Sequence, residues 1–129
     1  MSSEAVFQDR LKQIFFLRKV FIRQLKNTIP TAMPEDIDPT SKEGQQYLRD
    51  LALHGVEEMF EALQHLKNWK PHKLTEEKEF NKEEFLEEIV DAFNYFMALL
   101  IVVDVDHEKL FEAYLKKDQK IRKRLDEGY

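Results

Sequence analysis

Two acidic motifs are the part of this chain best suited to chemistry. Residues 57–61 read EEMFE and residues 88–91 read EIVD, each within a segment with helical spacing of apolar residues. Residues three apart lie on the same side of a helix, so each motif presents two carboxylates in one direction. If the two helices are antiparallel neighbours, four carboxylates converge, and such oxygens suit Mg²⁺ or, as a substitute, Mn²⁺. The predicted metal ligands are Glu58, Glu61, Glu88 and Asp91.

A simpler interpretation of these carboxylates has to be weighed against the metal site. Pairs of glutamates three apart are common on solvated helix faces, and Glu58 and Glu61 lie roughly opposite the apolar stripe of their helix. The second motif is more informative, because Asp91 precedes a segment that is apolar almost all round. We therefore expect Asp91 to be buried, where it needs a cation. That cation is either a metal ion or an arginine of the first helix, and the spacing favours neither.

The elements that position these motifs are predicted to be four helices. They run from about Glu4 to Asn27, from Gln45 to Asn68, from Asn81 to near Asp104, and from Asp106 to Gly128. Three prolines between residues 28 and 44 exclude a helix there, and Pro71 ends the second helix. Asn81 and Asp106 are typical N-caps. With no alternating strand pattern, the sequence predicts one all-α domain over residues 1–129, an antiparallel bundle of four to five helices.

Composition narrows the chemistry further. The chain has 129 residues and no cysteine, so disulfides and thiolate metal sites are excluded, and hard cations are favoured. A formal net charge of −5 argues against general nucleic-acid binding. The longest apolar stretch is too short to cross a bilayer and contains Asp91 and Asn94. Without a targeting segment at the start, we expect a cytoplasmic protein with no membrane partner.

The order and spacing of the acidic motifs resemble the E-E-x-x-E…E-x-x-D signature of the all-α NTP pyrophosphatases, the superfamily of MazG-like proteins, dimeric dUTPases and phage dCTPases. Two further segments strengthen the resemblance. Residues 68–70 (NWK) are similar to a segment that follows the second helix in dimeric phage dUTPases. Residues 114–117 (YLKK), Arg124 and the terminal Gly128-Tyr129 resemble the closing motif of dUTPases and phage dCTPases.

The resemblance implies a bundle of the all-α NTP pyrophosphatase type that hydrolyses a (deoxy)nucleoside triphosphate to the monophosphate and pyrophosphate. It makes Glu58, Glu61, Glu88 and Asp91 the Mg²⁺ ligands, while Glu57 or a ligand carboxylate helps to activate the attacking water. Beyond the metal, cations are needed for the triphosphate, and Gln13 is a loose equivalent of a base-binding residue. The base pocket is the part that matches the family least. The resemblance favours a deoxynucleotide as the substrate, with dUTP and dCTP ahead of purines. The predicted substrate-binding residues are Gln13, Trp69, Lys70, Asn94, Lys117, Arg124 and Tyr129.

Two statements about partners complete the prediction. Apolar surface on the Phe-rich first helix exceeds what one neighbour can bury, which favours a homodimer or homotetramer. The enzyme would control a nucleotide pool in a cell or, if phage-encoded, in the host cytoplasm. The alternative is a non-catalytic helical interaction module whose acidic face binds a basic partner.

Overall fold

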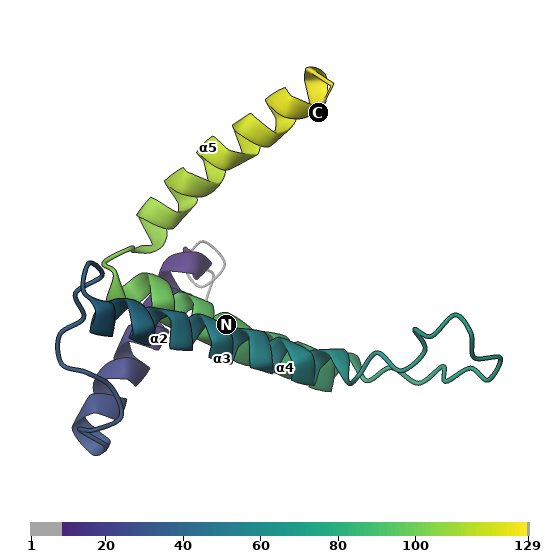
Figure 1. The fold of residues 1–129 in the computed structure, drawn as a ribbon, viewed down its shortest axis with the longest axis horizontal. Helices are drawn as coiled ribbons and strands as arrows, with labels where there is room; N and C mark the ends of the chain where they lie inside the picture. Colours follow the sequence, from purple (N-terminus) through teal and green to yellow (C-terminus); the bar gives the residue numbers. More distant parts are fainter. Residues whose placement is uncertain (1–8, 129) are drawn as a thin grey trace, which may run out of the picture. The chain divides into compact units, whose positions relative to one another are not determined.

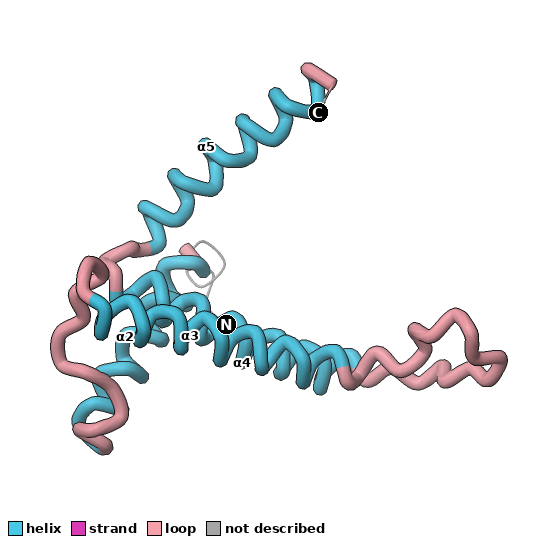
Figure 2. The backbone as a smooth tube through the Cα atoms, viewed as in Figure 1, coloured by secondary structure: helices cyan, strands magenta, loops and turns pink. Residues whose placement is uncertain are grey.

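The structure, a computed structural model, describes residues 9–128. Within this range it consists of four α-helices and no strand (Figures 1 and 2). The predicted all-α class is therefore confirmed, whereas the pyrophosphatase type of bundle stays a prediction. No helix in the same range combines the length and the apolar character that crossing a membrane requires. The helices are α2 (Arg10–Thr28), α3 (Lys42–Leu63), α4 (Lys82–Val102) and α5 (His107–Asp126).

All four helices begin with the same capping hydrogen bond. In each, a side-chain oxygen of the residue before the helix accepts from the backbone N–H three positions later, which satisfies one of the donors left open at a helix start. The predicted caps Asn81 and Asp106 are confirmed, at 3.1 Å from the Glu84 nitrogen and 2.8 Å from the Lys109 nitrogen. The other two caps are Asp9, at 3.0 Å from the Lys12 nitrogen, and Ser41, at 2.9 Å from the Gly44 nitrogen.

Predicted helix boundaries differ from the structure in places. The second helix begins at Lys42 and not at Gln45, because Ser41 caps it. The helix that contains Arg10 begins there, because Asp9 has an extended backbone and caps it; residues 4–8 lie outside the described range. The second helix ends at Leu63 and not at Asn68. Its last turn tightens into hydrogen bonds between residues three apart, from the Gln64 nitrogen to the Glu61 oxygen and onward to Leu66. The apolar spacing continues through such a turn, so periodicity alone places the helix end too late.

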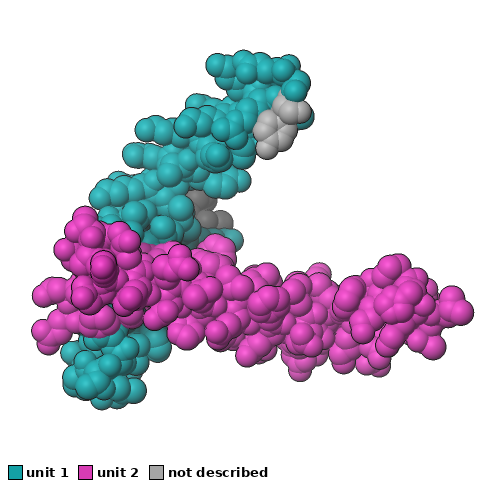
Figure 3. All heavy atoms as spheres, viewed as in Figure 1, with its two compact units in different colours: residues 1–33, 100–129 teal, residues 34–99 magenta. Residues whose placement is uncertain are grey.

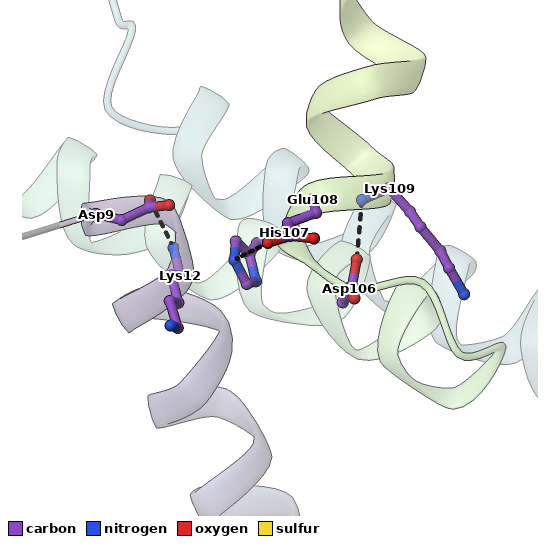
Figure 4. Close-up of polar contacts among 6 residues, drawn as sticks. All are labelled: Asp9, Lys12, Asp106, His107, Glu108 and Lys109. Atoms are coloured by element: carbon purple, nitrogen blue, oxygen red, sulfur yellow. Dashed lines mark hydrogen bonds and ion pairs between the residues drawn. The ribbon is translucent and has the colours of Figure 1, made fainter.

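The chain divides into two compact units, drawn in different colours in Figure 3. Unit 1 comprises residues 1–33 and 100–129, and unit 2 comprises residues 34–99. In unit 1, α2 contacts α5, and Figure 4 shows the capped first turns of these two helices. Phe15 is the buried residue of α2, whereas α5 has none.

Unit 2 is built on an antiparallel pair of helices, α3 and α4, which lie side by side in Figure 1. The Phe96 ring of α4 packs against Gly55 of α3, where an added Cβ would lie 2.9 Å from that ring. Beside Gly55, the rings of His54 on α3 and Tyr95 on α4 are 5.5 Å apart. At the other end of the pair, His65 lies near Glu84. Residue numbers thus rise along α3 as they fall along α4, and the acidic motifs lie at the same level.

Candidate metal centre

The carboxylates of three predicted ligands gather between α3 and α4. One oxygen each of Glu58, Glu88 and Asp91 lie within 4.8 Å of one another. Glu58 and Glu88 are half-buried and Asp91 is exposed. Glu58 belongs to α3 and the other two to α4, so the antiparallel packing of the helices brings the two acidic motifs together as the sequence predicts. Glu58 faces α4 and is not on the open side of α3.

The fourth predicted ligand, Glu61, acts on this group through its charge. Partial burial, and then the neighbouring carboxyl of Glu61, raise the pKa of Glu58 and the pKa of Glu88 above their ordinary values, and the charge of Asp91 adds to both shifts. At neutral pH the group therefore carries unfavourable negative charge.

One oxygen of this cluster stands out. Glu88 Oε2 is fully buried and, within residues 9–128, has no hydrogen-bond partner. Buried polar atoms are nearly always paired, so an orphaned carboxylate oxygen indicates a missing proton donor or cation. An all-oxygen donor set is the one Mg²⁺ and Mn²⁺ prefer, and opposite ligands of such an ion are about 4.2 Å apart. Oxygens within 4.8 Å need only small side-chain adjustments to reach that spacing. The residues present therefore fit a divalent cation.

His65 is a neighbour that the sequence analysis did not assign to this site. Its Nδ1 is 3.9 Å from Glu84 Oε2, and its charge opposes the rise in the pKa of Glu88. It follows Glu61 by four residues, a spacing that places both side chains on one side of a helix. The spacing from Glu61 to His65 could have predicted this position, because the turn after Leu63 continues the direction of the helix.

Two details of the prediction differ from the structure. Asp91 is exposed and not buried. The apolar side of α4 beside it is itself uncovered, with Val90 48% and Phe93 52% exposed, so apolar neighbours in the sequence did not imply burial. Glu57 has a partner outside the cluster: its Oε2 is 3.7 Å from His54 Nδ1. The predicted part of Glu57 in activating water stays a prediction.

Trp69 and Lys70 line a cavity on the other side of α3. The cavity has a volume of about 670 Å³ and also contacts Phe60 and Leu63. These two follow Glu58 by two and five residues, which at roughly 100° per residue places them opposite it on the helix. A role for Trp69 and Lys70 in a site shared with Glu58 has no support from this arrangement.

Of the remaining predicted substrate residues that the structure describes, one lies in unit 2 and three lie in unit 1. Asn94 is half-buried on α4, one turn after Asp91. Gln13 is exposed on α2, and Lys117 and Arg124 are exposed on α5, all in unit 1. Their part in substrate binding stays a prediction. Tyr129 lies outside the described residues.

Comparisons with models of known families, with curated proteins and with solved structures found no match for this chain. The two acidic motifs and the geometry of their carboxylates are therefore the basis for any functional assignment.

Proposed function

We propose that this protein is a Mg²⁺-dependent nucleoside triphosphate pyrophosphatase of the all-α type, acting on a deoxynucleotide such as dUTP or dCTP. The observation that supports it best is the gathering of Glu58, Glu88 and Asp91 within 4.8 Å, with Glu61 as a charged neighbour. The orphaned oxygen of Glu88 gives this cluster a need for a cation that an ordinary solvated acidic face lacks.

The four carboxylates have distinct parts in this proposal. Glu58 and Glu88, both half-buried, hold the cation from opposite helices, and the exposed Asp91 binds it at the side open to substrate. Glu61, whose charge raises the pKa of both glutamates, would add a further carboxylate beside the bound cation. A bound Mg²⁺ supplies positive charge to phosphate oxygens and lowers the pKa of water. Glu57 or a gathered carboxylate then accepts the proton of the attacking water.

Additional positive charge is needed for the triphosphate. Lys117 and Arg124 on α5 stay our candidates, because a triphosphate carries more charge than a divalent cation neutralises. Oligomerisation is part of the proposal: Phe16 on α2 is 63% exposed, Phe60 on α3 59%, and Phe111 on α5 56%. Large apolar side chains exposed on several helices favour a homodimer or homotetramer.

The direct test is pyrophosphate release with Mg²⁺ across dUTP, dCTP, dTTP, dATP, dGTP and the ribonucleotides. We expect cleavage of one or two substrates that is lost in Asp91→Asn. Glu87→Gln is the matched control, because Glu87 is an exposed acid on the same helix outside the cluster. Absence of cleavage by the folded protein with both Mg²⁺ and Mn²⁺, for every nucleotide, would contradict the proposal.

The second candidate is a non-catalytic interaction module, and the same exposed apolar side chains favour it. It makes different demands on the carboxylates. Under this alternative, Mg²⁺ leaves the melting temperature unchanged, and Glu58→Gln weakens the binding of a basic partner in a salt-dependent way. Under the enzyme proposal, Mg²⁺ raises the melting temperature and the variant loses turnover while it keeps its fold.

A further inference from the structure

The cavity on the far side of α3 combines an aromatic wall with a concentration of positive charge. Its apolar lining consists of Phe60, Leu63, Leu66 and Trp69. Three lysines, Lys67, Lys70 and Lys73, line it together with the polar side chains of Gln64 and Thr75 and one acid, Glu77. All of this lining except Phe60 and Leu63 comes from the connection between α3 and α4, drawn as a loop in Figure 2.

The positive charges of the three cavity lysines are not neutralised by ion pairs. Among the described residues none of them forms an ion pair, although five acids lie between residues 76 and 84 on the same connection and helix start. The ammonium of Lys70 lies over the Trp69 ring, 5.5 Å from its centre. A cation held above an indole and two more at the rim form a local excess of positive charge in a chain of net charge −5.

Apolar lining and unpaired cations select a particular class of ligand. The indole of Trp69 is 68% exposed and Phe60 is 59% exposed, so both offer ring surface to a planar molecule. Ligand cavities usually have a volume of about 300–1,000 Å³, with a few polar groups that fix orientation. This cavity falls in that range at about 670 Å³. An aromatic ring would lie against Trp69 while an anionic group reaches the lysines.

We propose that this cavity is a second ligand site, separate from the carboxylate cluster, for a small aromatic anion. The two sites lie on opposite sides of α3: Glu58 faces α4, whereas Phe60 and Leu63 face the cavity. They also have opposite charge. Binding in the cavity needs no divalent cation and does not depend on the catalytic proposal.

Trp69 is the only tryptophan, so its fluorescence reports on this cavity alone. The probe is 8-anilinonaphthalene-1-sulfonate, an aromatic anion that quenches tryptophan by energy transfer. Titration without Mg²⁺ should quench Trp69 with saturation, and the Lys67→Ala/Lys73→Ala variant should bind about tenfold more weakly, because each lysine gives a charge-assisted contact. The uncharged analogue N-phenyl-1-naphthylamine should bind more weakly than the sulfonate to the original protein.

The control variant is Lys42→Ala/Lys82→Ala, which removes the same charge from exposed first residues of α3 and α4 outside the cavity. Its affinity should equal that of the unchanged protein, and all variants should keep their helical circular dichroism. Equal loss of affinity in both double variants would show that the dye senses only overall charge and would overturn the proposal. So would equal affinities for the sulfonate and its uncharged analogue, or saturable dye binding with no change in Trp69 fluorescence.

Discussion

The two sides of α3 carry opposite charges and are built in different ways. The side that faces α4 holds acids between two regular helices that pack against each other at Gly55. The other side holds lysines, and much of its wall is the connection after Leu63. Two packed helices fix side chains more precisely than a loop does. The comparison suggests that the acidic side is shaped for a metal ion with strict geometry, and the basic side for a ligand that tolerates adjustment.

The largest expected effect is a loss of turnover in a variant of the acidic side that leaves ligand binding on the basic side unchanged. Asp91→Asn removes a predicted ligand and should lower Mg²⁺-dependent turnover by at least about a hundredfold, since loss of even an outer-shell partner costs about 10–100-fold. Quenching of Trp69 by the aromatic sulfonate should be unchanged in the same variant. Steady-state pyrophosphate release and the fluorescence titration give both numbers, with Glu87→Gln as the matched control. Parallel loss of both activities would show that the sides are not independent.

Gly55→Ala should disturb the acidic side by changing how α3 packs against α4. An added Cβ would lie 2.9 Å from the Phe96 ring, so the ring or the helices must shift. Such overpacking costs about 1–3 kcal/mol, partly offset by the better helix propensity of alanine, worth about 1 kcal/mol. Urea unfolding should show a lower free energy of unfolding, and metal affinity should fall with it. Unchanged stability and metal affinity would mean that the packing at Gly55 does not position the cluster.

Glu88→Gln should separate the effect of the acidic side on stability from its effect on metal binding. Because burial and neighbouring acids raise the pKa of Glu88, its charged form is unfavourable in the folded protein. Without metal, the glutamine variant should therefore melt a few degrees higher at pH 8, and it should lose the rise in melting temperature that Mg²⁺ gives to the unchanged protein. Differential scanning fluorimetry with EDTA and with Mg²⁺ measures both. A lower melting point in EDTA would contradict the account.

The smallest effect expected is a dependence of stability on pH in the absence of metal. Glu58 and Glu88 have raised pKa values, so between the ordinary glutamate pKa and these raised values the folded protein binds more protons than the unfolded chain. Stability from these groups is present below the ordinary value and is lost as pH rises through the raised values. Chemical unfolding in EDTA from pH 4.5 upward should show this decline, and Glu58→Gln/Glu88→Gln should reduce it. A decline of equal size in that variant would place its origin elsewhere.

Capping and spacing predicted much of this fold, and tertiary packing decided the rest. Asn81 and Asp106 start their helices as predicted, because a capping hydrogen bond involves only neighbouring residues. The convergence of Glu58 with Glu88 and Asp91 also followed, since helical spacing and an antiparallel pair suffice. The exposure of Asp91 could not be predicted, because it depends on which apolar side of α4 finds a neighbour. The cavity at Trp69 was missed for a similar reason: a loop conformation creates it.

Titration with Mn²⁺ tests whether the carboxylates between α3 and α4 bind a divalent cation. Free Mn²⁺ gives a strong electron paramagnetic resonance signal that is lost on binding, so titration counts bound ions without a substrate. We expect saturable Mn²⁺ binding that is lost in Glu58→Gln and in Asp91→Asn and is retained in Glu87→Gln. Mg²⁺ should displace the bound Mn²⁺. Binding of equal affinity in all of these variants, or no saturable binding by the folded protein, would contradict metal binding at these carboxylates.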